Sequence, residues 1–384
     1  MLPDLTKDEF LRYSRHLLIP EVGLEGQRKL KKASVLIVGT GGLGSPISLY
    51  LAAAGIGRIG IVDYDAVELS NLQRQVIHGT NALEVPKVES ASRRMLDLNP
   101  NITVEAFNTV FDSSNAKRIA EGFDILVDGT DNFPTRYLLN DLAVLSKKPF
   151  VYGSVFRFEG HVSVFDATRG PCYRCMFSSP PDPGLVPSCA EGGVFGVMPG
   201  IIGTIQATEV IKLILGIGEP LIGTLLLVDS LETSFQKVTI PRNPDCLVCG
   251  TKPVIRDLID YEEYCGSSIR SPESLDLEPG MTITPRELSQ LITSANPPKI
   301  IDVRSPVEQQ ISAFPSAENI PVEQLGQALG SIEKEKLIVL VCRTGIRSGR
   351  AALRMKKAGF TNVKNLKGGI NAWADEIDPT LRRY

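Results

Sequence analysis

Short apolar runs alternate with amphipathic stretches along the first part of the chain. An apolar, β-branched run at 33–39 leads into glycines, a helical stretch follows at 45–54, and a second strand at 59–63 completes a βαβ unit. Strands that alternate with helices predict a mostly parallel sheet covered by helices, which is an α/β fold. The same alternation continues in strands expected at 103–107, 124–128 and 149–152 and in helices expected around 87–98 and 135–146.

The pattern changes after residue 150. Residues 156–165 alternate as a hairpin does, and a further strand is expected at 225–229, so the sheet is predicted to become mixed. The apolar stretch 194–217 is interrupted by four glycines, a proline and two charged residues. It predicts a buried helix preceded by a loop, and no membrane span.

A polar, acidic stretch lies between residues 250 and 280, and its composition is typical of a linker. Beyond it an α/β pattern restarts, and 384 residues exceed a single compact core. We therefore expect a first domain at 1–250, a linker at 251–280 and a smaller domain at 281–384.

Charge and composition limit the partners. A net charge of -3 gives no general attraction to nucleic acid. Charged residues interrupt the N-terminal segment, so it does not read as a secretory signal, and a cytoplasmic protein is expected. In that compartment thiols stay reduced, so the seven cysteines indicate metal binding or catalysis rather than disulfides.

A glycine-rich motif, Gly39-Thr-Gly-Gly42-Leu-Gly44, follows the first strand and opens a helix. Its glycines let the backbone approach phosphates, the helix N-terminus offers N–H groups, and Asp63 after the next strand can bind ribose hydroxyls. The alternatives are a glycine turn that only packs helix on strand, and the dinucleotide site of an NAD-dependent oxidoreductase. Cations and a metal-capable carboxylate near the same sheet edge favour a triphosphate instead; they come from Ser70-Asn71-Leu72-Gln73-Arg74, Lys87, Asp131 and Asn132.

The sequence closely resembles the MoeB/ThiF family, the bacterial relatives of ubiquitin-activating enzymes, over roughly its first two-thirds. The motifs that carry the resemblance are Arg12-Tyr-Ser-Arg15, the glycine motif, Ser70 to Arg74, Pro86-Lys87, Thr130-Asp131-Asn132 and Cys172-Tyr-Arg-Cys175. The resemblance implies a Rossmann-like domain that uses ATP to adenylate the C-terminal glycine of a carrier protein.

The same resemblance assigns roles to single residues. It implies that Arg74 and Lys87 contact the phosphates, that Asp131 holds Mg²⁺, and that Asn132 helps to bind the nucleotide. It also implies that Arg15 reaches into the site of a partner subunit, which would require a homodimer. Without the resemblance, Arg15 and Lys87 would read as solvated helix residues.

Two CxxC pairs, Cys172/Cys175 and Cys246/Cys249, predict a closed, structural Cys₄ zinc site. Two independent redox motifs are the alternative. Between the pairs, Cys189 occupies a position where family relatives carry a cysteine that can bond to the carrier or its sulfur, and an inert loop thiol is the other reading.

A further cysteine opens a candidate catalytic loop, Cys342-Arg343-Thr344-Gly345-Ile346-Arg347, between a buried strand and a helix. Backbone N–H groups, the helix N-terminus and two arginines would stabilise a thiolate or persulfide there. A buried strand-end cysteine is the alternative.

This last segment resembles the rhodanese domain. The resemblance rests on Asp302-Val-Arg304 with Glu308, Asn319-Ile-Pro321, the Cys342 loop and Lys367-Gly-Gly-Ile-Asn-Ala-Trp373. One departure is Ala313-Phe-Pro-Ser316, where many rhodaneses read His-Ile-Pro-Gly.

Both resemblances together match the fused type of molybdopterin synthase sulfurylase. They imply adenylation of a ubiquitin-like, MoaD-like carrier ending in Gly-Gly, followed by sulfur transfer from a Cys342 persulfide for molybdenum cofactor biosynthesis. Thiosulfate or a cysteine desulfurase would supply the sulfur. A ThiS-like carrier, a ubiquitin-related modifier and a non-catalytic scaffold are the other readings.

Overall fold

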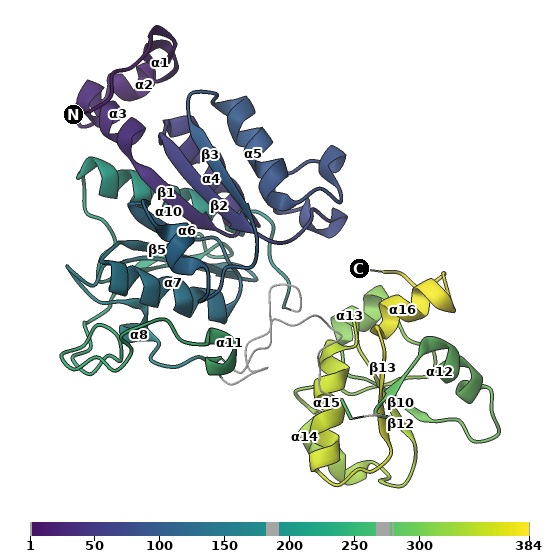
Figure 1. Cartoon of the computed structure of the whole chain (residues 1–384). Coiled ribbons are helices and arrows are strands. Elements are labelled where there is room, and N and C mark those ends of the chain that lie inside the picture. Colours follow the sequence, from purple (N-terminus) through teal and green to yellow (C-terminus); the bar gives the residue numbers. More distant parts are fainter. Residues whose placement is uncertain (1, 182–191, 266–276, 279, 384) are drawn as a thin grey trace. The chain divides into compact units, whose positions relative to one another are not determined.

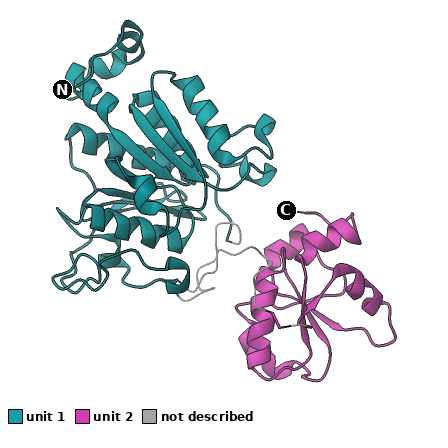
Figure 2. Ribbon diagram, viewed as in Figure 1, with its two compact units in different colours: residues 1–267 teal, residues 268–384 magenta. Residues whose placement is uncertain are grey.

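The structure is a computed structural model that describes residues 2–181, 192–265, 277–278 and 280–383. Its chain forms two compact units, Met1–Ser267 and Ser268–Tyr384, each with its own sheet (Figure 2). Unit 1 thus includes residues 251–265, which the sequence assigned to the linker. Tyr261 in that segment is buried in the unit 1 core because its ring packs with apolar side chains of the sheet and its helices.

Unit 1 contains an eight-stranded sheet with the order β3-β2-β1-β4-β5-β6-β7-β8 (Figure 1). The strands from β3 to β5 in this order are parallel, and those from β5 to β8 are antiparallel. The mixed sheet is confirmed. The strands are β1 (Ser34–Val38), β2 (Arg58–Asp63), β3 (Thr103–Asn108), β4 (Ile125–Asp128), β5 (Phe150–Phe156), β6 (Glu159–Phe165), β7 (Thr224–Asp229) and β8 (Ser234–Thr239).

Helices cover both faces of this sheet. β1 is buried throughout because alternate side chains enter two cores, one shared with α4, α5 and α10 and the other with α6 and α7. The helices are α1 (Lys7–Arg12), α2 (Ser14–Leu17), α3 (Gly23–Lys32), α4 (Gly44–Ala54), α5 (Lys87–Leu98), α6 (Ala116–Ala120), α7 (Phe133–Ser146), α8 (Tyr173–Met176), α10 (Met198–Leu215) and α11 (Tyr261–Tyr264).

Among the described residues, α10 is the one helix whose length and apolar composition would suffice to cross a membrane. Half of this helix is buried in unit 1, where it packs on α4, β5 and β6. Its apolar composition therefore serves the core, as the interrupted apolar stretch predicted.

Unit 2 contains a five-stranded, all-parallel sheet with the order β11-β10-β12-β13-β9. One core lies against α15 and the other against α12 and α16, which confirms a second, smaller α/β unit. The elements are β9 (Thr282–Ile283), α12 (Pro285–Ile292), β10 (Lys299–Asp302), α13 (Pro306–Ile311), β11 (Glu318–Asn319), α14 (Leu325–Ala328), β12 (Ile338–Val341), α15 (Ile346–Lys357), β13 (Val363–Leu366) and α16 (Gly369–Glu376).

Candidate active sites

The glycine motif lies where the strand order of unit 1 reverses. The chain leaves β1 toward β2 and β3 on one side, then returns to β4 on the other side of β1. Loops after β1 and β4 diverge at such a point and leave a crevice at the carboxyl ends of the strands. The two loops meet at Gly39 (φ +94°), where an added Cβ would lie 2.6 Å from the carbonyl oxygen of Gly129. Only glycine fits this approach.

The glycine motif has backbone N–H groups available to bind an anion. Asp63 Oδ2 accepts hydrogen bonds from the backbone N–H of Thr40 (2.8 Å) and from its hydroxyl (3.0 Å). Among the described residues, the N–H groups of Gly41 and Gly42 have no acceptor. They are therefore available to phosphate oxygens, and Asp63 sits at the end of β2 with its second oxygen bonded to the N–H of Asp65 (3.0 Å).

A histidine that the sequence analysis passed over clamps the same loop. His78 is buried, with Nε2 3.1 Å from the carbonyl oxygen of Thr40 and Nδ1 2.9 Å from the hydroxyl of Ser90 in α5. Because the carbonyl can only accept, Nε2 carries the proton and Nδ1 accepts from Ser90. Burial lowers the pKa of His78, so the neutral ring is favoured. A single histidine gives no sequence pattern from which this role could be read.

Lys87 opens α5 and is buried, and its ammonium binds Asp65 at 2.8 Å. Asp65 comes two residues after Asp63, so the cation lies beside the crevice. Between them, Tyr64 has an exposed ring. Desolvation and the carboxylates of Asp65, Asp63 and Asp131 raise the pKa of Tyr64, so all three carboxylates act on this tyrosine.

The segment from Ser70 to Arg74 lies against the glycine motif. A Cβ at Gly42 would lie 3.7 Å from Cγ of Arg74 and 3.1 Å from Pro199 in α10. The guanidinium of Arg74 donates to the carbonyl oxygen of Ser70 at 3.0 Å. The remaining members differ in exposure: Ser70 and Gln73 are exposed, Leu72 is half-buried and Asn71 is buried.

Asp131 and Asn132 follow β4 at the same edge. Asp131 is exposed, whereas the side chain of Asn132 caps α7 by accepting from the N–H of Thr135 at 2.9 Å. A buried ion pair supports this loop, because Asp128 binds Arg136 Nε (2.9 Å) as well as the N–H (2.9 Å) and hydroxyl (2.6 Å) of Thr130. Asn132 can offer only its amide N–H groups to a ligand while it caps the helix.

Arg15 lies at the other end of the sheet. It is exposed on α2, which packs on α3, and α3 leads into the start of β1, whereas the glycine motif follows the end of β1. A strand of five residues is about 17 Å long. Arg15 is therefore not brought to the glycine motif of its own chain.

The four cysteines of the CxxC pairs converge, with their Sγ atoms within 4.8 Å of one another. Individual Sγ–Sγ distances are 4.0 Å (Cys172–Cys175), 3.5 Å (Cys172–Cys246) and 3.4 Å (Cys175–Cys249). Thiolates in a tetrahedron around zinc lie about 3.8 Å apart, so the donor set and spacing fit that ion. The reading as two independent redox motifs does not account for this convergence.

Arg174, inside the first CxxC pair, forms a fully buried ion pair with Asp141 of α7 at 2.7 and 2.8 Å. The hydroxyl of Tyr261 donates to Asp141 (2.8 Å), and Arg174 donates to the hydroxyl of Tyr264 (2.7 Å). These bonds tie α11 to the cysteine cluster. Cys189, the expected covalent residue, lies outside the described residues.

In unit 2, Cys342 follows β12 and is buried at the base of the predicted loop. Its sulfur lies 3.2 Å from the N–H of Gly345, 3.4 Å from the N–H of Ser348 and 3.1 Å from the Ser348 hydroxyl. Asn365 of β13 orients that hydroxyl by accepting from it at 2.6 Å. These N–H groups and the start of α15 face the sulfur and would stabilise an anion on it.

The start of α16 fixes the outer side of the same loop. The N–H groups of Ile370 and Asn371 donate to the carbonyl oxygens of Cys342 (2.8 Å) and Arg343 (3.1 Å). These bonds hold the backbone of the loop, in which the N–H of Gly345 faces the sulfur of Cys342. The Lys367-to-Trp373 motif therefore acts on the loop, a role that the resemblance alone did not supply.

The charges around the loop are partly paired. Arg347 forms a bidentate salt bridge with Glu308 of α13 at 2.8 and 2.5 Å, so its charge is already matched. Thr344, Ile346 and Arg343 are half-buried on the rim, and Gly345 caps α15 with φ +90°.

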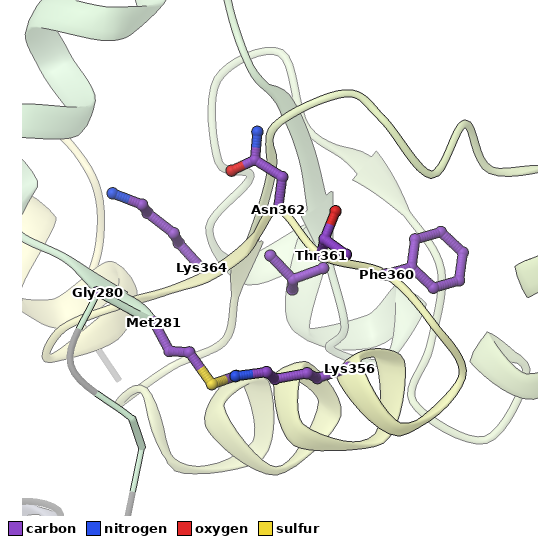
Figure 3. A pocket seen from close by; sticks show the side chains of 8 residues that line it. Gly280, Met281, Lys356, Phe360, Thr361, Asn362 and Lys364 are labelled. Atoms are coloured by element: carbon purple, nitrogen blue, oxygen red, sulfur yellow. The ribbon is translucent and has the colours of Figure 1, made fainter.

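A surface cavity of about 170 Å³ also lies in unit 2, and its lining includes Met281, Lys356, Phe360 and Lys364 (Figure 3). It opens beside the start of β13, whereas Cys342 follows the end of the parallel neighbour β12. Its lining residues include no cysteine, histidine or carboxylate, so the cavity is separate from the sulfur site.

Comparison with known proteins gives the two units their families. Residues 13–248 match the ThiF family and residues 284–376 match the rhodanese-like domain. The chain is also 46% identical to the probable adenylyltransferase/sulfurtransferase MoeZ of Mycobacterium tuberculosis, over 99% of its own length and 96% of that protein. The chain belongs to the ThiF family.

Other relatives of this ThiF-family chain support each unit. The adenylyltransferase and sulfurtransferase MOCS3 of Culex quinquefasciatus is 42% identical over 99% of the chain and 90% of that protein. The sulfur carrier protein adenylyltransferase of Thermus thermophilus is 53% identical, over 68% of the chain and 98% of that protein. A crystal structure of E. coli MccB with succinimide has a TM-score of 0.56 and 26% identity, covering 64% of this chain and 75% of MccB.

These matches confirm the two resemblances read from the motifs. The ThiF-family chain is an enzyme that combines an ATP-using adenylyltransferase with a rhodanese-type sulfurtransferase. An NAD-dependent oxidoreductase and a non-catalytic scaffold are thereby set aside.

Proposed function

We propose that this enzyme adenylates the C-terminal glycine of a ubiquitin-like sulfur carrier and then converts the activated carboxyl group to a thiocarboxylate. Residues 1–250 carry out adenylation and residues 281–384 carry out sulfur transfer. The observation that carries the proposal is the presence in one chain of an anion-binding glycine motif flanked by cations and of a cysteine whose sulfur faces backbone N–H groups. The Thermus relative named for a sulfur carrier protein supports the choice of substrate.

Adenylation joins two anions, so positioning and charge neutralisation dominate the catalytic problem. The carrier carboxylate attacks the α-phosphorus of ATP, the bond to the bridging oxygen breaks, and pyrophosphate leaves as the acyl adenylate forms. The N–H groups of Gly41 and Gly42 and the cations Arg74 and Lys87 bind phosphate oxygens, and Asp63 binds the ribose. Asn132 donates from its amide.

Two ions complete the proposed enzyme. Asp131 would hold Mg²⁺ at the exposed edge of β4, and the ion would offset phosphate charge. The four clustered cysteines would hold Zn²⁺, which supplies folding free energy because four thiolates leave no open position.

Arg15 acts in trans in this proposal. Its place at the far end of its own sheet is compatible with a homodimer in which each protomer supplies Arg15 to its partner's phosphate site. Adenylation would then depend on dimer concentration, whereas sulfur transfer would not.

Sulfur enters through Cys342. Its thiolate attacks the sulfane sulfur of a donor, either thiosulfate or the persulfide of a cysteine desulfurase, and becomes a persulfide as sulfite or a thiol leaves. The persulfide then attacks the acyl adenylate and displaces AMP, and a thiol reductant cleaves the acyl disulfide to release the thiocarboxylate. Cys189 would bond covalently to the carrier by displacing AMP to form a thioester, which the Cys342 persulfide would then attack as the Cys189 thiolate leaves.

Exposed apolar side chains offer the carrier a surface in unit 1. Phe158 and Phe195 have ring centroids 5.4 Å apart, and the chain runs from Phe195 through Val197 to Pro199, which contacts Gly42. A carrier bound there could extend its C-terminal tail to the glycine motif. Leu231 in the turn between β7 and β8 and Phe235 of β8 are exposed as well.

The resemblance to molybdopterin synthase sulfurylases supports the choice of carrier. We assign a MoaD-like carrier and a role in cytoplasmic molybdenum cofactor biosynthesis. A ThiS-like carrier or a ubiquitin-related modifier would undergo the same chemistry and is tested alongside.

Intact-protein mass spectrometry of candidate Gly-Gly carriers tests the proposal. Incubation with the enzyme, Mg·ATP, thiosulfate and a reductant should exchange one carrier oxygen for sulfur. Lys87→Ala should lower ATP–pyrophosphate exchange by about 10² to 10³ and leave thiosulfate sulfurtransfer intact, and Cys342→Ala should do the reverse. Arg93→Ala, on the exposed side of the same helix as Lys87, and Cys265→Ala are the matched controls. If every candidate carrier stays unmodified although the enzyme is active in both partial reactions, the proposed product is ruled out.

A further inference from the structure

Glu308 and Cys342 lie at the same edge of the unit 2 sheet. β10 and β12 are adjacent and parallel; α13, which carries Glu308, follows β10, and the Cys342 loop follows β12. Both segments therefore leave the sheet at the carboxyl ends of neighbouring strands. Glu308 belongs to a different element from the loop, yet it faces the loop.

The contact between them is a paired charge. Arg347 donates from Nη1 to Glu308 Oε2 at 2.8 Å and from Nη2 to Oε1 at 2.5 Å. The two side chains are 17% and 13% exposed, so solvent screens the pair only in part. Arg347 immediately precedes Ser348, whose N–H and hydroxyl contact the sulfur of Cys342, so this pair borders the reactive atom.

The side chain of Glu308 is positioned by its own helix as well as by Arg347. It is the fourth residue of a capping box, in which its Oε2 accepts from the N–H and the hydroxyl of Ser305, both at 3.1 Å, and its N–H donates to the Ser305 hydroxyl at 3.3 Å. The carboxylate is therefore held in place by its own helix start. It is a fixed negative charge rather than a mobile one.

Thiosulfate and an organic persulfide differ in the charge that this edge of the sheet must bind. Any donor benefits from the N–H groups of Gly345 and Ser348, because these face the sulfur of Cys342 itself. The sulfonate of thiosulfate adds one negative charge beyond the sulfur that is transferred, so thiosulfate is a dianion, and an arginine free to form a bidentate contact is the side chain best suited to bind the sulfonate. In this protein the guanidinium of Arg347 already binds the carboxylate of Glu308.

We propose that Glu308 is a donor-specificity residue that neutralises Arg347 and thereby disfavours thiosulfate relative to an organic persulfide. The inference rests on the proposed sulfur transfer by Cys342. In that step the Cys342 thiolate bonds to the terminal sulfur of the donor R–S–S⁻ as the donor S–S bond breaks, and R–S⁻ leaves and takes up a proton. No external oxidant or reductant is needed, because sulfane sulfur passes from one thiol to another.

The variant Glu308→Gln tests this assignment. Glutamine still forms a capping box, so the start of α13 is retained while the charge is removed. With cyanide as acceptor, kcat/KM for thiosulfate should rise about tenfold through a lower KM, because loss of the Glu308 carboxylate makes this edge one charge more positive and so attracts a dianion in a partly exposed site. The value for cysteine persulfide should stay within about twofold.

Glu287→Gln is the matched control. Glu287 occupies the same position in the capping box of α12, with Thr284 as its partner. It should leave both donors unchanged. The double variant E308Q/R347Q removes both charges and should return the thiosulfate-to-persulfide ratio to within about twofold of wild type.

The outcomes are separable. An unchanged or lowered thiosulfate-to-persulfide ratio in folded E308Q, relative to E287Q, would overturn the role of Glu308, and so would a gain that persists in E308Q/R347Q. If E308Q fails to fold, Arg347→Gln gives a second arm: it removes a positive charge from this edge and should lower the same ratio about tenfold, and an unchanged ratio would overturn the assignment. Failure of the proposed function is recognised independently, by cyanide-dependent sulfurtransfer that survives Cys342→Ala.

Discussion

A Cβ atom added at Gly369 would lie 2.3 Å from the carbonyl oxygen of Cys342. The next residue, Ile370, donates its N–H to that same oxygen at 2.8 Å. The start of α16 therefore rests directly on the peptide group of the reactive cysteine. Gly369 also has φ +62°, a conformation that other residues adopt only with strain.

Replacing Gly369 should disable sulfur transfer. In Gly369→Ala the new methyl group and the strained φ should push α16 away from Cys342 and turn the loop N–H groups off its sulfur. We expect thiosulfate-to-cyanide turnover to fall at least about tenfold and unit 2 to lose about 1–3 kcal/mol of stability. Gly326→Ala in α14, where an added Cβ meets nothing within 4 Å, should change neither. Wild-type turnover in Gly369→Ala would contradict this view of the loop.

The stability of unit 1 should depend on the protonation of His78. Burial lowers the pKa of this histidine in the folded state, so the unfolded chain takes up the proton more readily. The stability is therefore fully present above the unfolded pKa of about 6.5 and is lost as the pH falls below it. Calorimetry of the full chain between pH 5 and 8 should show this decline, and His78→Gln should flatten it.

His161, whose pKa burial also lowers, should contribute in the same direction, so His161→Gln provides the comparison. His78→Gln should additionally raise the KM for ATP more than it lowers kcat, because the carbonyl oxygen of Thr40 loses the imidazole N–H that donates to it. An unaltered pH profile and ATP KM in His78→Gln would argue against the clamp.

Removal of the proposed metal should affect only unit 1. In Cys246→Ser one ligand of the cluster is lost, so bound zinc measured by elemental analysis should fall and the melting temperature of unit 1 should drop by at least about 10 °C. Cys265→Ala lacks a thiol outside the cluster and should keep the metal. Cyanide-dependent sulfurtransfer should stay at the wild-type level in both. Zinc that remains stoichiometric in Cys246→Ser would exclude a four-cysteine site.

The exposed aromatic pair of unit 1 should matter for the carrier alone. Phe195→Asp places a charge where the proposed carrier contact is apolar, so the KM for the carrier in ATP–pyrophosphate exchange should rise at least about tenfold. Phe235→Asp tests whether the contact extends to β8. The exposed residue Val254 lies elsewhere in unit 1, and Val254→Asp should have no effect. Equal carrier KM values in all three variants would place the contact on another surface.

The sequence predicted the buried parts of the fold well and the exposed edges poorly. β1 is apolar throughout because both its faces are covered, and such a run is easily recognised. β8 is almost wholly exposed, and β9 and β11 have two residues each, so none of them shows an alternating pattern. The polar residues 251–265 read as a linker because their anchors have distant partners, which leave no local signature: the Tyr261 hydroxyl donates to Asp141, and Lys117 pairs with Asp257.

For the sites, motifs predicted which residue types gather and where. They did not predict which charges are already paired, because the partners come from other elements. Lys87 binds Asp65, and Arg347 binds Glu308, each through a contact fixed only by the folded sheet edge. His78 was missed for the same reason, since both of its hydrogen bonds are made to distant segments.

The pairing of β9 with β13 has a consequence for biosynthesis. Along the chain β9 is the first strand of unit 2 and β13 is the last, yet the two strands pair in the sheet. The N–H of Asn365 donates to the carbonyl oxygen of Met281. Asn365 also orients the Ser348 hydroxyl next to the sulfur of Cys342. A ribosome must therefore synthesise the chain as far as β13 before the first strand of this unit meets its neighbour. The environment of the reactive sulfur is completed only then, so the thiol cannot acquire its full set of hydrogen bonds in a product terminated before β13.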